Sequence, residues 1–373
     1  MKNIVILGST GSVGVQTLDI VRAFPNELNV VGLVANNNTQ LLNKQIDEFQ
    51  PDFINFNPQL ISSIKLQSAK HEKNIDIISN PIVDIIVVAT PSLHSLEETL
   101  EALKIGKTIA LASKEIIVSA QSLLEEIEDV RKKILPVDSE PSAIWQCIEK
   151  ESSIANIIIT ASGGSLRNIS TDKYENVTPE QVLNHPVWSM GSKITIDSAT
   201  FANKAFEVIE AKWLFDIDYE KISVLVHPQS IIHSIVEFND GSMKAQLANP
   251  DMRLPIQHAL LYPERKPNDL VSPLNLAEIG KLEFNETDNH KYPCFKLILD
   301  AAKLGKSYPA LICATDEVLV NAFLNRQIKY TDIPRYLEKI INQHKPSIIT
   351  KDTIIQITEE TRYKTLELIN NKL

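Results

Sequence analysis

The sequence predicts an α/β fold for the amino-terminal part of the chain, followed by an α+β domain and a C-terminal helical bundle. Over residues 1–138, short β-branched runs alternate with helical patterns, which is typical of βαβ units on a parallel sheet. After about residue 150 the strand patterns stand closer together, and residues 292–371 are almost purely helical in pattern. We therefore expect domains at residues 1–138, 139–261 and 291–373, with a linker at 262–290.

The elements of the first domain follow from the spacing of their apolar residues. Residues 84–90 (DIIVVAT) form a continuous apolar run, as a strand that is buried on both faces requires. The other predicted strands lie at residues 4–7, 30–35 and 108–112, and the helices at 12–24, 39–49 and in a stretch that ends at residue 105. Since helices alternate with these strands, we expect the strands to be parallel.

The second domain is expected to contain a mostly antiparallel sheet with helices packed against it. Its predicted strands lie at residues 154–161, 223–227, 231–238 and 243–247. The last two are joined by Asn239, Asp240 and Gly241, a sequence typical of a hairpin turn. Residues 262–290 are rich in proline, asparagine and charge and lack a period, which favours a linker.

The composition excludes several classes of protein. The chain has 373 residues, is 43% hydrophobic and has no apolar run near the roughly 18 residues of a membrane span. Its net charge of −10 disfavours nucleic acid and anionic membranes as partners. Cys147, Cys294 and Cys313 form no CxxC pair, and a strand pattern follows Met1 too soon for a secretory signal. We therefore expect a cytoplasmic protein.

Three glycines in "ILGSTGSVGVQTLDIV" predict a phosphate-binding turn. Gly8, Gly11 and Gly14 come after a strand and at the start of a helix. Glycine allows the backbone to approach a pyrophosphate closely, and the helix start offers unpaired N–H groups to it. The spacing is GxxGxxG instead of the commoner GxGxxG, and a tight turn without a ligand is the alternative. With the βαβ pattern, the glycines favour a Rossmann-type dinucleotide-binding domain.

The segment after the second strand bears on the choice of cofactor. An acidic residue there would bind a ribose diol and repel a 2′-phosphate, but the chain has Asn36, Asn37 and Asn38. The absence of an acid favours NADP over NAD. The alternative is that these asparagines simply cap the next helix.

Acidic residues in two segments predict a metal site. In "LPVDSEPSAIW", Asp138 and Glu140 would face one spot if the segment were extended. If residues 199–213 form a helix, Asn203, Lys204 and Glu207 share one face of it. Three carboxylates without histidine or thiolate ligands suit Mg²⁺ or Mn²⁺, while Ser198, Asn203 and Lys204 could hold a phosphate. Each acid taken alone has an alternative as a surface residue or helix cap.

The sequence also resembles the 1-deoxy-D-xylulose 5-phosphate reductoisomerase family over essentially its whole length. The strings that carry the resemblance are "ILGSTGS", "LDIVR", "GKTIALASKE", "PVDSE", "SGG", "HPVWSMGSKITIDSAT", "HPQSIIHS", "PDMRLPI" and "YPC". The resemblance implies a metal-assisted rearrangement of the ketose phosphate and reduction by NADPH to 2-C-methyl-D-erythritol 4-phosphate. It also implies a homodimer, formed through the sheet of the middle domain.

The resemblance further implies a role for particular residues. The metal ligands would be Asp138, Glu140 and Glu207. The catalytic residues would be Lys114, Glu140 and His185. The substrate would contact Ser139, Glu140, Ser162, His185, Trp188, Ser198, Asn203, Lys204 and Glu207. NADPH would contact Gly8, Thr10, Gly11, Ser12, Val13, Asn36, Asn37, Asn38, Ser113, Lys114, Glu115, Met190 and Gly191.

Two structural expectations complete this set. Residues 185–191 (HPVWSMG) would form a flap, in which Trp188 closes over the substrate and Met190 lies by the nicotinamide. Ser139 can reach the same substrate as its two acidic neighbours only if the chain bends, so we expect a loop there, bracketed by Pro136 and Pro141.

Departures from the family pattern cluster on the cofactor side. The family's cationic position after the second strand is Asn37, its usual asparagine before the Lys-Glu pair is Ser113, and its Gly-Ala-Ala-Gly is replaced by residues 92–95 (SLHS). The residue after Ser-Gly-Gly is Ser165, where proline is usual. We expect an altered NADPH affinity without loss of the reaction.

Two rival interpretations remain at the level of sequence. The segment "ATPSLHSLEETLEALKIGKTIALASKE" also looks like the glucose-fructose oxidoreductase type of dehydrogenase, which needs no metal. A cofactor-binding regulator with a helical interaction module is the non-enzymatic alternative, but it would leave Asp138, Glu140 and Glu207 without a purpose.

Overall fold

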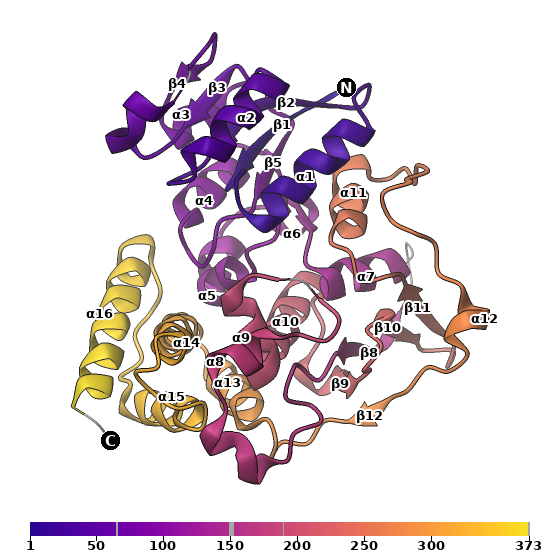
Figure 1. Ribbon diagram of the computed structural model, residues 1–373, viewed down its shortest axis with the longest axis vertical. Coiled ribbons are helices and arrows are strands. Elements are labelled where there is room, and N and C mark those ends of the chain that lie inside the picture. Colours follow the sequence, from indigo (N-terminus) through magenta and orange to yellow (C-terminus); the bar gives the residue numbers. More distant parts are fainter. Residues whose placement is uncertain (65, 149–152, 189, 372–373) are drawn as a thin grey trace. The chain divides into compact units, whose positions relative to one another are not determined.

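The computed structural model describes residues 1–64, 66–148, 153–188 and 190–371 (Figure 1). Its contacts divide the chain into two compact units. Unit 1 comprises Met1–Ser113, Leu124–Ser142 and Asp251–Ser272, and unit 2 comprises Lys114–Leu123, Ala143–Pro250 and Pro273–Leu373. Ser189 of the predicted flap, residues 149–152 of the predicted second domain and residues 372–373 of the third lie outside the described residues.

Unit 1 is built on a parallel sheet with the strand order β4-β3-β2-β1-β5-β6-β7 (Figure 1). The strands are β1 Lys2–Leu7, β2 Leu28–Val34, β3 Phe53–Asn55, β4 Lys70–His71, β5 Ile85–Val88, β6 Thr108–Leu111 and β7 Ile134–Pro136. The chain order reverses beside β1, which is the switch point where doubly wound folds bind their ligands. The predicted α/β fold is thus confirmed.

The helices of unit 1 include one that returns from far along the chain. They are α1 Ser12–Ala23, α2 Thr39–Phe49, α3 Asn74–Ser79, α4 Leu96–Lys104, α6 Val130–Lys133, α11 Arg253–Leu261 and the 3₁₀ helix η1 Pro58–Ser63; α5 Lys114–Glu125 and α7 Ser139–Cys147 contain residues of both units. Ile256 and Leu260 of α11 belong to the same buried core as Ile4 of β1. Lys2 Nζ donates to the Leu260 carbonyl at 2.9 Å. Residues 253–261 therefore pack in the core of unit 1.

Unit 2 contains a mixed sheet with the strand order β11-β10-β8-β9-β12. The strands are β8 Ile154–Ala161, β9 Ile222–Val226, β10 Ile232–Phe238, β11 Met243–Leu247 and β12 Asn285–Glu286. Among these described strands, the pairings are antiparallel except that of β8 with β9. Gly241 takes a φ of 82° in the predicted hairpin turn between β10 and β11. The predicted linker, residues 262–290, contributes β12 to this sheet. The ends of the linker at residues 262 and 290 stay a prediction.

Unit 2 also contains helices, most of which surround a second apolar core. They are α8 Pro179–Leu183, α9 Ser192–Thr200, α10 Ala202–Phe215, α12 Leu276–Ile279, α13 Pro293–Lys303, α14 Tyr308–Leu324, α15 Asp332–Gln343 and α16 Lys351–Asn370, with 3₁₀ helices η2 Thr171–Asn176 and η3 Tyr219–Lys221. Phe206 of α10, Ile298 of α13 and Phe323 of α14 are buried together in this core. The predicted helical pattern of residues 292–371 is confirmed. No helix in the described ranges is long and apolar enough to cross a membrane.

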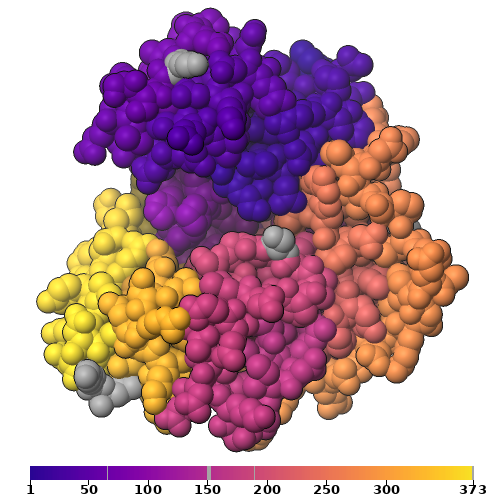
Figure 2. Space-filling view, viewed as in Figure 1, coloured from indigo at the N-terminus to yellow at the C-terminus, as the bar shows by residue number. Residues whose placement is uncertain are grey.

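Surface ion pairs join the C-terminal helices to the segment before α9. Lys329 contacts Glu175 at 2.8 Å, and Arg326 contacts Glu180 at 2.5 Å. These segments lie side by side on the face shown in Figure 2, where they are coloured orange and magenta. Both pairs are mostly exposed, so we expect them to contribute little to stability.

The glycine turn between β1 and α1 is packed backbone against backbone, which makes it intolerant of a side chain. A Cβ on Gly14 would lie 2.3 Å from the Gly8 carbonyl oxygen and 2.6 Å from Ser9 Cα. We expect Gly14→Ala to lower the free energy of unfolding by about 1–3 kcal/mol, because the helix must move away from the turn. Gly11→Ala is the control, since its Cβ would meet the Gly8 oxygen at 3.3 Å. Urea denaturation measures both, and equal losses would contradict this account.

Candidate active site

The carboxylates of "PVDSEPS" lie at the start of a helix in unit 1. β7 ends at Pro136 and α7 begins at Ser139, so the predicted loop at Ser139 is wrong. The Asp138 carboxylate accepts a hydrogen bond from the Ser139 N–H at 2.9 Å, and Ser139 Oγ donates to Glu140 Oε2 at 2.6 Å. Pro141 is tolerated there because the N–H groups of the first helical turn have no partner within the helix. The bend that the sequence required is thus the first turn of a helix.

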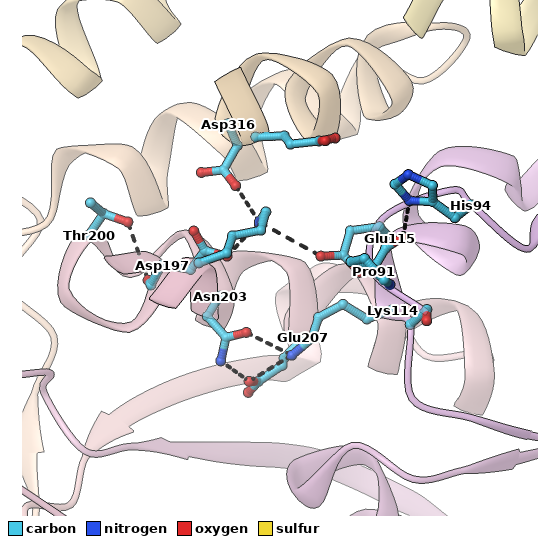
Figure 3. Close-up of polar contacts among 12 residues, drawn as sticks. Pro91, His94, Lys114, Glu115, Asp197, Thr200, Asn203, Glu207 and Asp316 are labelled. Atoms are coloured by element: carbon cyan, nitrogen blue, oxygen red, sulfur yellow. Dashed lines mark hydrogen bonds and ion pairs between the residues drawn. The ribbon is translucent and has the colours of Figure 1, made fainter. Parts of the chain in front are cut away.

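The predicted polar face of α10 is present in unit 2 and centres on Glu207. This side chain is fully buried. Its Oε1 accepts from Asn203 Nδ2 at 2.5 Å and from Lys114 Nζ at 3.2 Å, while Oε2 accepts from Lys204 Nζ at 2.5 Å. Lys114 Nζ also donates to Asn203 Oδ1 at 2.8 Å, and Figure 3 shows the side chains of Lys114, Asn203 and Glu207 pointing toward one another. A buried carboxylate is therefore held between two ammonium groups and an amide.

Ser162 lies in the turn after β8. The turn uses glycines with positive φ, 86° at Gly163 and 68° at Gly164. A Cβ on Gly164 would lie 2.8 Å from the Ser198 carbonyl oxygen and 2.7 Å from Ala199 Cα, so the turn packs directly on the end of α9. The structure thereby brings the turn that carries Ser162 against the end of α9, where the predicted phosphate ligand Ser198 lies.

The predicted flap begins at His185, whose ring is bonded on both sides. Nε2 lies 3.0 Å from Ser162 Oγ, and Nδ1 accepts from the backbone N–H groups of Val187 at 3.2 Å and Trp188 at 2.8 Å. Burial, together with the nearby Arg167, lowers the pKa of His185 to about 4. The Trp188 ring lies 5.8 Å from the ring of the buried His233. The flap backbone and the Ser162 turn are thus linked through one imidazole.

The rest of the flap leads into α9. Gly191 is the residue before the first turn of α9, and its carbonyl accepts from the Thr195 N–H at 3.1 Å. Met190 is partly buried. Neither observation tests the predicted contacts of Met190 and Gly191 with a nicotinamide, which stay a prediction.

Most of the predicted cofactor residues of unit 1 lie in two turns at the carboxyl ends of β1 and β2. Thr10, Gly11, Ser12 and Val13 form the β1–α1 turn and the first residues of α1, where no described side chain caps the helix. N–H groups of this kind bind phosphate. After β2, Asn38 Oδ1 accepts from the Leu41 N–H at 3.1 Å, so this asparagine caps α2, which was the alternative interpretation.

Two further predicted cofactor residues make contacts within the protein. Ser113 is buried at the end of β6, and its hydroxyl donates to the Thr90 carbonyl. Glu115 lies on α5 in unit 2, with Oε1 3.7 Å from Lys193 Nζ. Asn36 and Asn37 contact Asn57, through a backbone bond of 3.3 Å and a side-chain bond of 3.5 Å.

Sequence reasoning missed a charge cluster between α9 and α14, whose two aspartates are buried. Lys193 Nζ lies 2.6 Å from Asp197 Oδ2 and 2.7 Å from Asp316 Oδ2, so it joins α9 to α14 (Figure 3 shows the acids). Burial and the neighbouring Asp316 raise the pKa of Asp197 well above its usual value. The i,i+4 spacing of Lys193 and Asp197 was visible in the sequence, but the partnership with Asp316 was not.

Breaking this cluster is expected to destabilise unit 2. Lys193→Met leaves buried carboxylates without their cation, and we expect a loss of about 3 kcal/mol at pH 7. The loss should shrink as the pH falls, because the carboxylates become neutral by binding protons. Lys296→Met is a matched control, since Lys296 pairs with Asp300 at the same spacing on an exposed surface, and should cost less than about 1 kcal/mol. Equal losses in urea denaturation would contradict this account.

Comparisons with known proteins agree along the whole chain. Family models match residues 4–121 (1-deoxy-D-xylulose 5-phosphate reductoisomerase), 134–215 (1-deoxy-D-xylulose 5-phosphate reductoisomerase C-terminal domain) and 247–364 (DXP reductoisomerase C-terminal domain). Among curated relatives, the 1-deoxy-D-xylulose 5-phosphate reductoisomerase of Desulforamulus reducens is 46% identical over 359 residues, 92% of each chain. That of Caldanaerobacter subterraneus subsp. tengcongensis is 44% identical and covers 97% of this chain and 98% of the relative.

Solved structures give the same result. A DOX-P reductoisomerase in complex with NADPH, fosmidomycin and magnesium has a TM-score of 0.93 and 34% identity, over 99% of this chain and 98% of the other. The 1-deoxy-D-xylulose 5-phosphate reductoisomerase from Zymomonas mobilis in complex with NADPH has a TM-score of 0.91 and 35% identity, over 99% of both chains.

Proposed function

Because the chain belongs to the 1-deoxy-D-xylulose 5-phosphate reductoisomerase family, we propose that it isomerises and reduces this substrate with NADPH and a divalent metal. The product would be 2-C-methyl-D-erythritol 4-phosphate. The observation that carries the proposal is the buried Glu207 between Lys114, Asn203 and Lys204, because a fold alone needs no such group in an apolar helix.

The chemistry of the acidic residues fits Mg²⁺ or Mn²⁺. Asp138, Glu140 and Glu207 would supply its ligands. Carboxylate oxygens are the ligands that these hard ions prefer, and Asp138 and Glu207 are both buried. A bound metal of this kind polarises a carbonyl and a neighbouring hydroxyl of the substrate. A magnesium-bound relative is consistent with this assignment.

The protein's own side chains would position the substrate phosphate in unit 2. Ser162 and Ser198 would donate hydroxyl groups, and Asn203 and Lys204 would donate from the first turn of α10. The packing of the Ser162 turn on the end of α9 supports this group. The start of a helix of 14 residues also favours an anion.

Residues beside the reacting carbons would stabilise negative charge that develops on the substrate and exclude water from the site. Hydrogen bonds to Asn203 and Glu207 hold Lys114 Nζ in place. Its positive charge would stabilise an oxyanion that develops on the substrate. Ser139 and Glu140 would contact the substrate hydroxyl groups from the first turn of α7. Trp188 would close over the substrate and exclude water, which strengthens every charge interaction inside the site.

NADPH would bind to unit 1 at the β1–α1 turn. The uncapped first turn of α1 would receive the pyrophosphate, with Gly8, Thr10, Gly11, Ser12 and Val13 around it. Asn36, Asn37 and Asn38 would lie near the 2′-phosphate, and Ser113, Lys114, Glu115, Met190 and Gly191 nearer the nicotinamide. The NADPH complexes of two similar structures support this assignment.

Restoring a cation after β2 is expected to tighten NADPH binding. Asn37→Lys adds a charge-assisted hydrogen bond to the 2′-phosphate, and we expect the KM for NADPH to fall about tenfold. NADH provides the control within the same experiment, because it lacks the 2′-phosphate and its KM should not change. Steady-state kinetics with both cofactors measure the effect. A KM for NADPH that stays the same or rises would remove the prediction.

We also propose a cytoplasmic homodimer without nucleic acid or membrane partners. The resemblance to the family supports the dimer, and the net charge of −10 argues against anionic partners.

Oxidation of NADPH by the purified protein tests the proposed function. With 1-deoxy-D-xylulose 5-phosphate and Mg²⁺, we expect NADPH consumption that stops on addition of EDTA. Oxidation that continues in EDTA would favour the metal-independent glucose-fructose oxidoreductase type of dehydrogenase. No oxidation under either condition would favour a non-enzymatic regulator.

A further inference from the structure

The His185 ring joins the flap backbone to Ser162, 23 residues earlier in unit 2, through three polar contacts, and Ser162 Oγ makes a fourth. On one side, the backbone N–H groups of Val187 and Trp188 point at Nδ1, at 3.2 and 2.8 Å. On the other side, Nε2 lies 3.0 Å from Ser162 Oγ. The Gly164 N–H also donates to Ser162 Oγ, at 3.1 Å. These contacts form a series from the flap backbone through His185 to Ser162. Backbone N–H groups donate at both ends of the series, so the direction of each hydrogen bond in it can be assigned.

The flap end fixes the tautomer of the ring. A backbone N–H can only donate, so Nδ1 must accept and cannot carry a proton. The ring is neutral at pH 7, because burial and the nearby Arg167 lower its pKa to about 4. In a neutral imidazole one nitrogen carries the proton, and here it must be Nε2.

The other end then fixes the role of the Ser162 hydroxyl. Ser162 Oγ has two acceptor positions and one proton to donate. Its acceptor positions are taken by the Gly164 N–H and by His185 Nε2–H. The one hydrogen bond that Ser162 Oγ can still make uses its own proton, which it can donate to a ligand. Such a serine binds a group that offers an acceptor oxygen and rejects a group that offers a donor.

We propose that the flap backbone, acting through the Nε2–H tautomer of His185, makes Ser162 an obligate hydrogen-bond donor to an acceptor oxygen of the substrate's anionic group. The identity of that group as a phosphate rests on the proposed function. His185 is accordingly a positioning residue here, in place of the predicted catalytic role.

Nitrogen NMR of the full-length protein tests the tautomer without any reference to activity. In ¹⁵N-histidine-labelled protein at pH 7, we expect His185 to show a protonated Nε2 and an unprotonated Nδ1. The signal is assigned by its loss in His185→Gln. A protonated Nδ1, or shifts averaged between the two tautomers, would overturn the proposal even in a protein that turns over its substrate.

A pair of amide variants tests the coupling to Ser162. In His185→Asn the side-chain oxygen replaces Nδ1 and can accept from the flap, but the bond to Ser162 is lost; in His185→Gln the amide nitrogen replaces Nε2 and can still donate to Ser162. We expect Ser162→Ala and His185→Asn each to raise the substrate KM about tenfold. We expect His185→Gln to raise it less than about threefold, because this variant keeps the bond to Ser162.

The double variant Ser162→Ala/His185→Asn tests whether His185 affects the substrate KM only through Ser162. We expect its KM to equal that of Ser162→Ala alone, because His185 acts through Ser162. Effects that multiply to about a hundredfold would show that His185 acts independently and would overturn the proposal. If the wild-type protein fails to turn over the substrate, the proposed function fails, whereas the NMR result still decides the tautomer.

Discussion

Replacing Glu207 with glutamine is expected to lower kcat/KM by about a thousandfold or more, because the proposed metal site would lose a negatively charged ligand worth several kcal/mol of charge stabilisation. The side chain keeps its shape, so Asn203 and Lys114 retain a hydrogen-bond acceptor at Oε1. With the amide oxygen at the Oε1 position, Lys204 Nζ faces the amide NH2 group instead of an acceptor, and the variant is therefore also expected to be less stable. Mn²⁺ binding, followed by electron paramagnetic resonance, should weaken together with activity.

Glu220→Gln is the control for this substitution, because Glu220 is 76% exposed and lies 3.5 Å from Lys303 on the surface. We expect this variant to keep wild-type kinetics and metal affinity. If Glu207→Gln remained folded and bound Mn²⁺ as tightly as the wild type, Glu207 would not be a metal ligand.

Replacing Lys204 with methionine is expected to raise the KM for 1-deoxy-D-xylulose 5-phosphate about 10- to 100-fold, because the proposed charged hydrogen bond to the phosphate would be lost. The KM for NADPH should not change, since Lys204 is not among the residues proposed to contact NADPH. The substitution also leaves Glu207 Oε2 without the Lys204 bond, so the thermal midpoint must be measured beside the kinetics.

Lys212→Met is the matched control for Lys204→Met, because Lys212 lies on the same helix two turns further on and is partly buried. It should leave both Michaelis constants unchanged. A Lys204→Met enzyme in which both substrates lose affinity equally would indicate a general structural defect instead of a lost phosphate contact.

The long elements of the fold could be predicted from the sequence, whereas the short ones could not. A strand such as β5 carries a continuous apolar run, and its burial on both faces makes that run necessary. In contrast, β4 and β12 have two residues each, which is too short for any period to show. Their pairing is decided by the neighbouring strands, which only the tertiary structure supplies.

The return of α11 to unit 1 illustrates a second limit. The period of residues 253–261 indicates a helix with an apolar face, but it does not indicate which core receives that face. Ile256 and Leu260 belong to the same buried core as Ile4 of β1, some 250 positions earlier in the chain, and Lys2 donates to the Leu260 carbonyl. A domain boundary at residue 261 follows from local composition, which does not register such a contact.

The same contrast holds for the candidate site. The shared face of Asn203, Lys204 and Glu207 follows from the helical repeat and is present. The contacts between His185 and Ser162, and between Lys193 and Asp316, join segments far apart in the sequence and have no local pattern. The bend at Ser139 was required by the chemistry, but proline was read as a sign of a loop where it lies in the first turn of a helix.

The central claim is that this chain couples a metal-dependent rearrangement to reduction by NADPH. The most direct test is to incubate the protein with 1-deoxy-D-xylulose 5-phosphate, NADPH and Mg²⁺ and to identify the product by ¹³C NMR. We predict 2-C-methyl-D-erythritol 4-phosphate, formed in equal amount to the NADPH consumed, and no product when the metal is removed by EDTA. Unchanged substrate in the presence of metal, or a reduced sugar with an unbranched carbon skeleton, would contradict the claim.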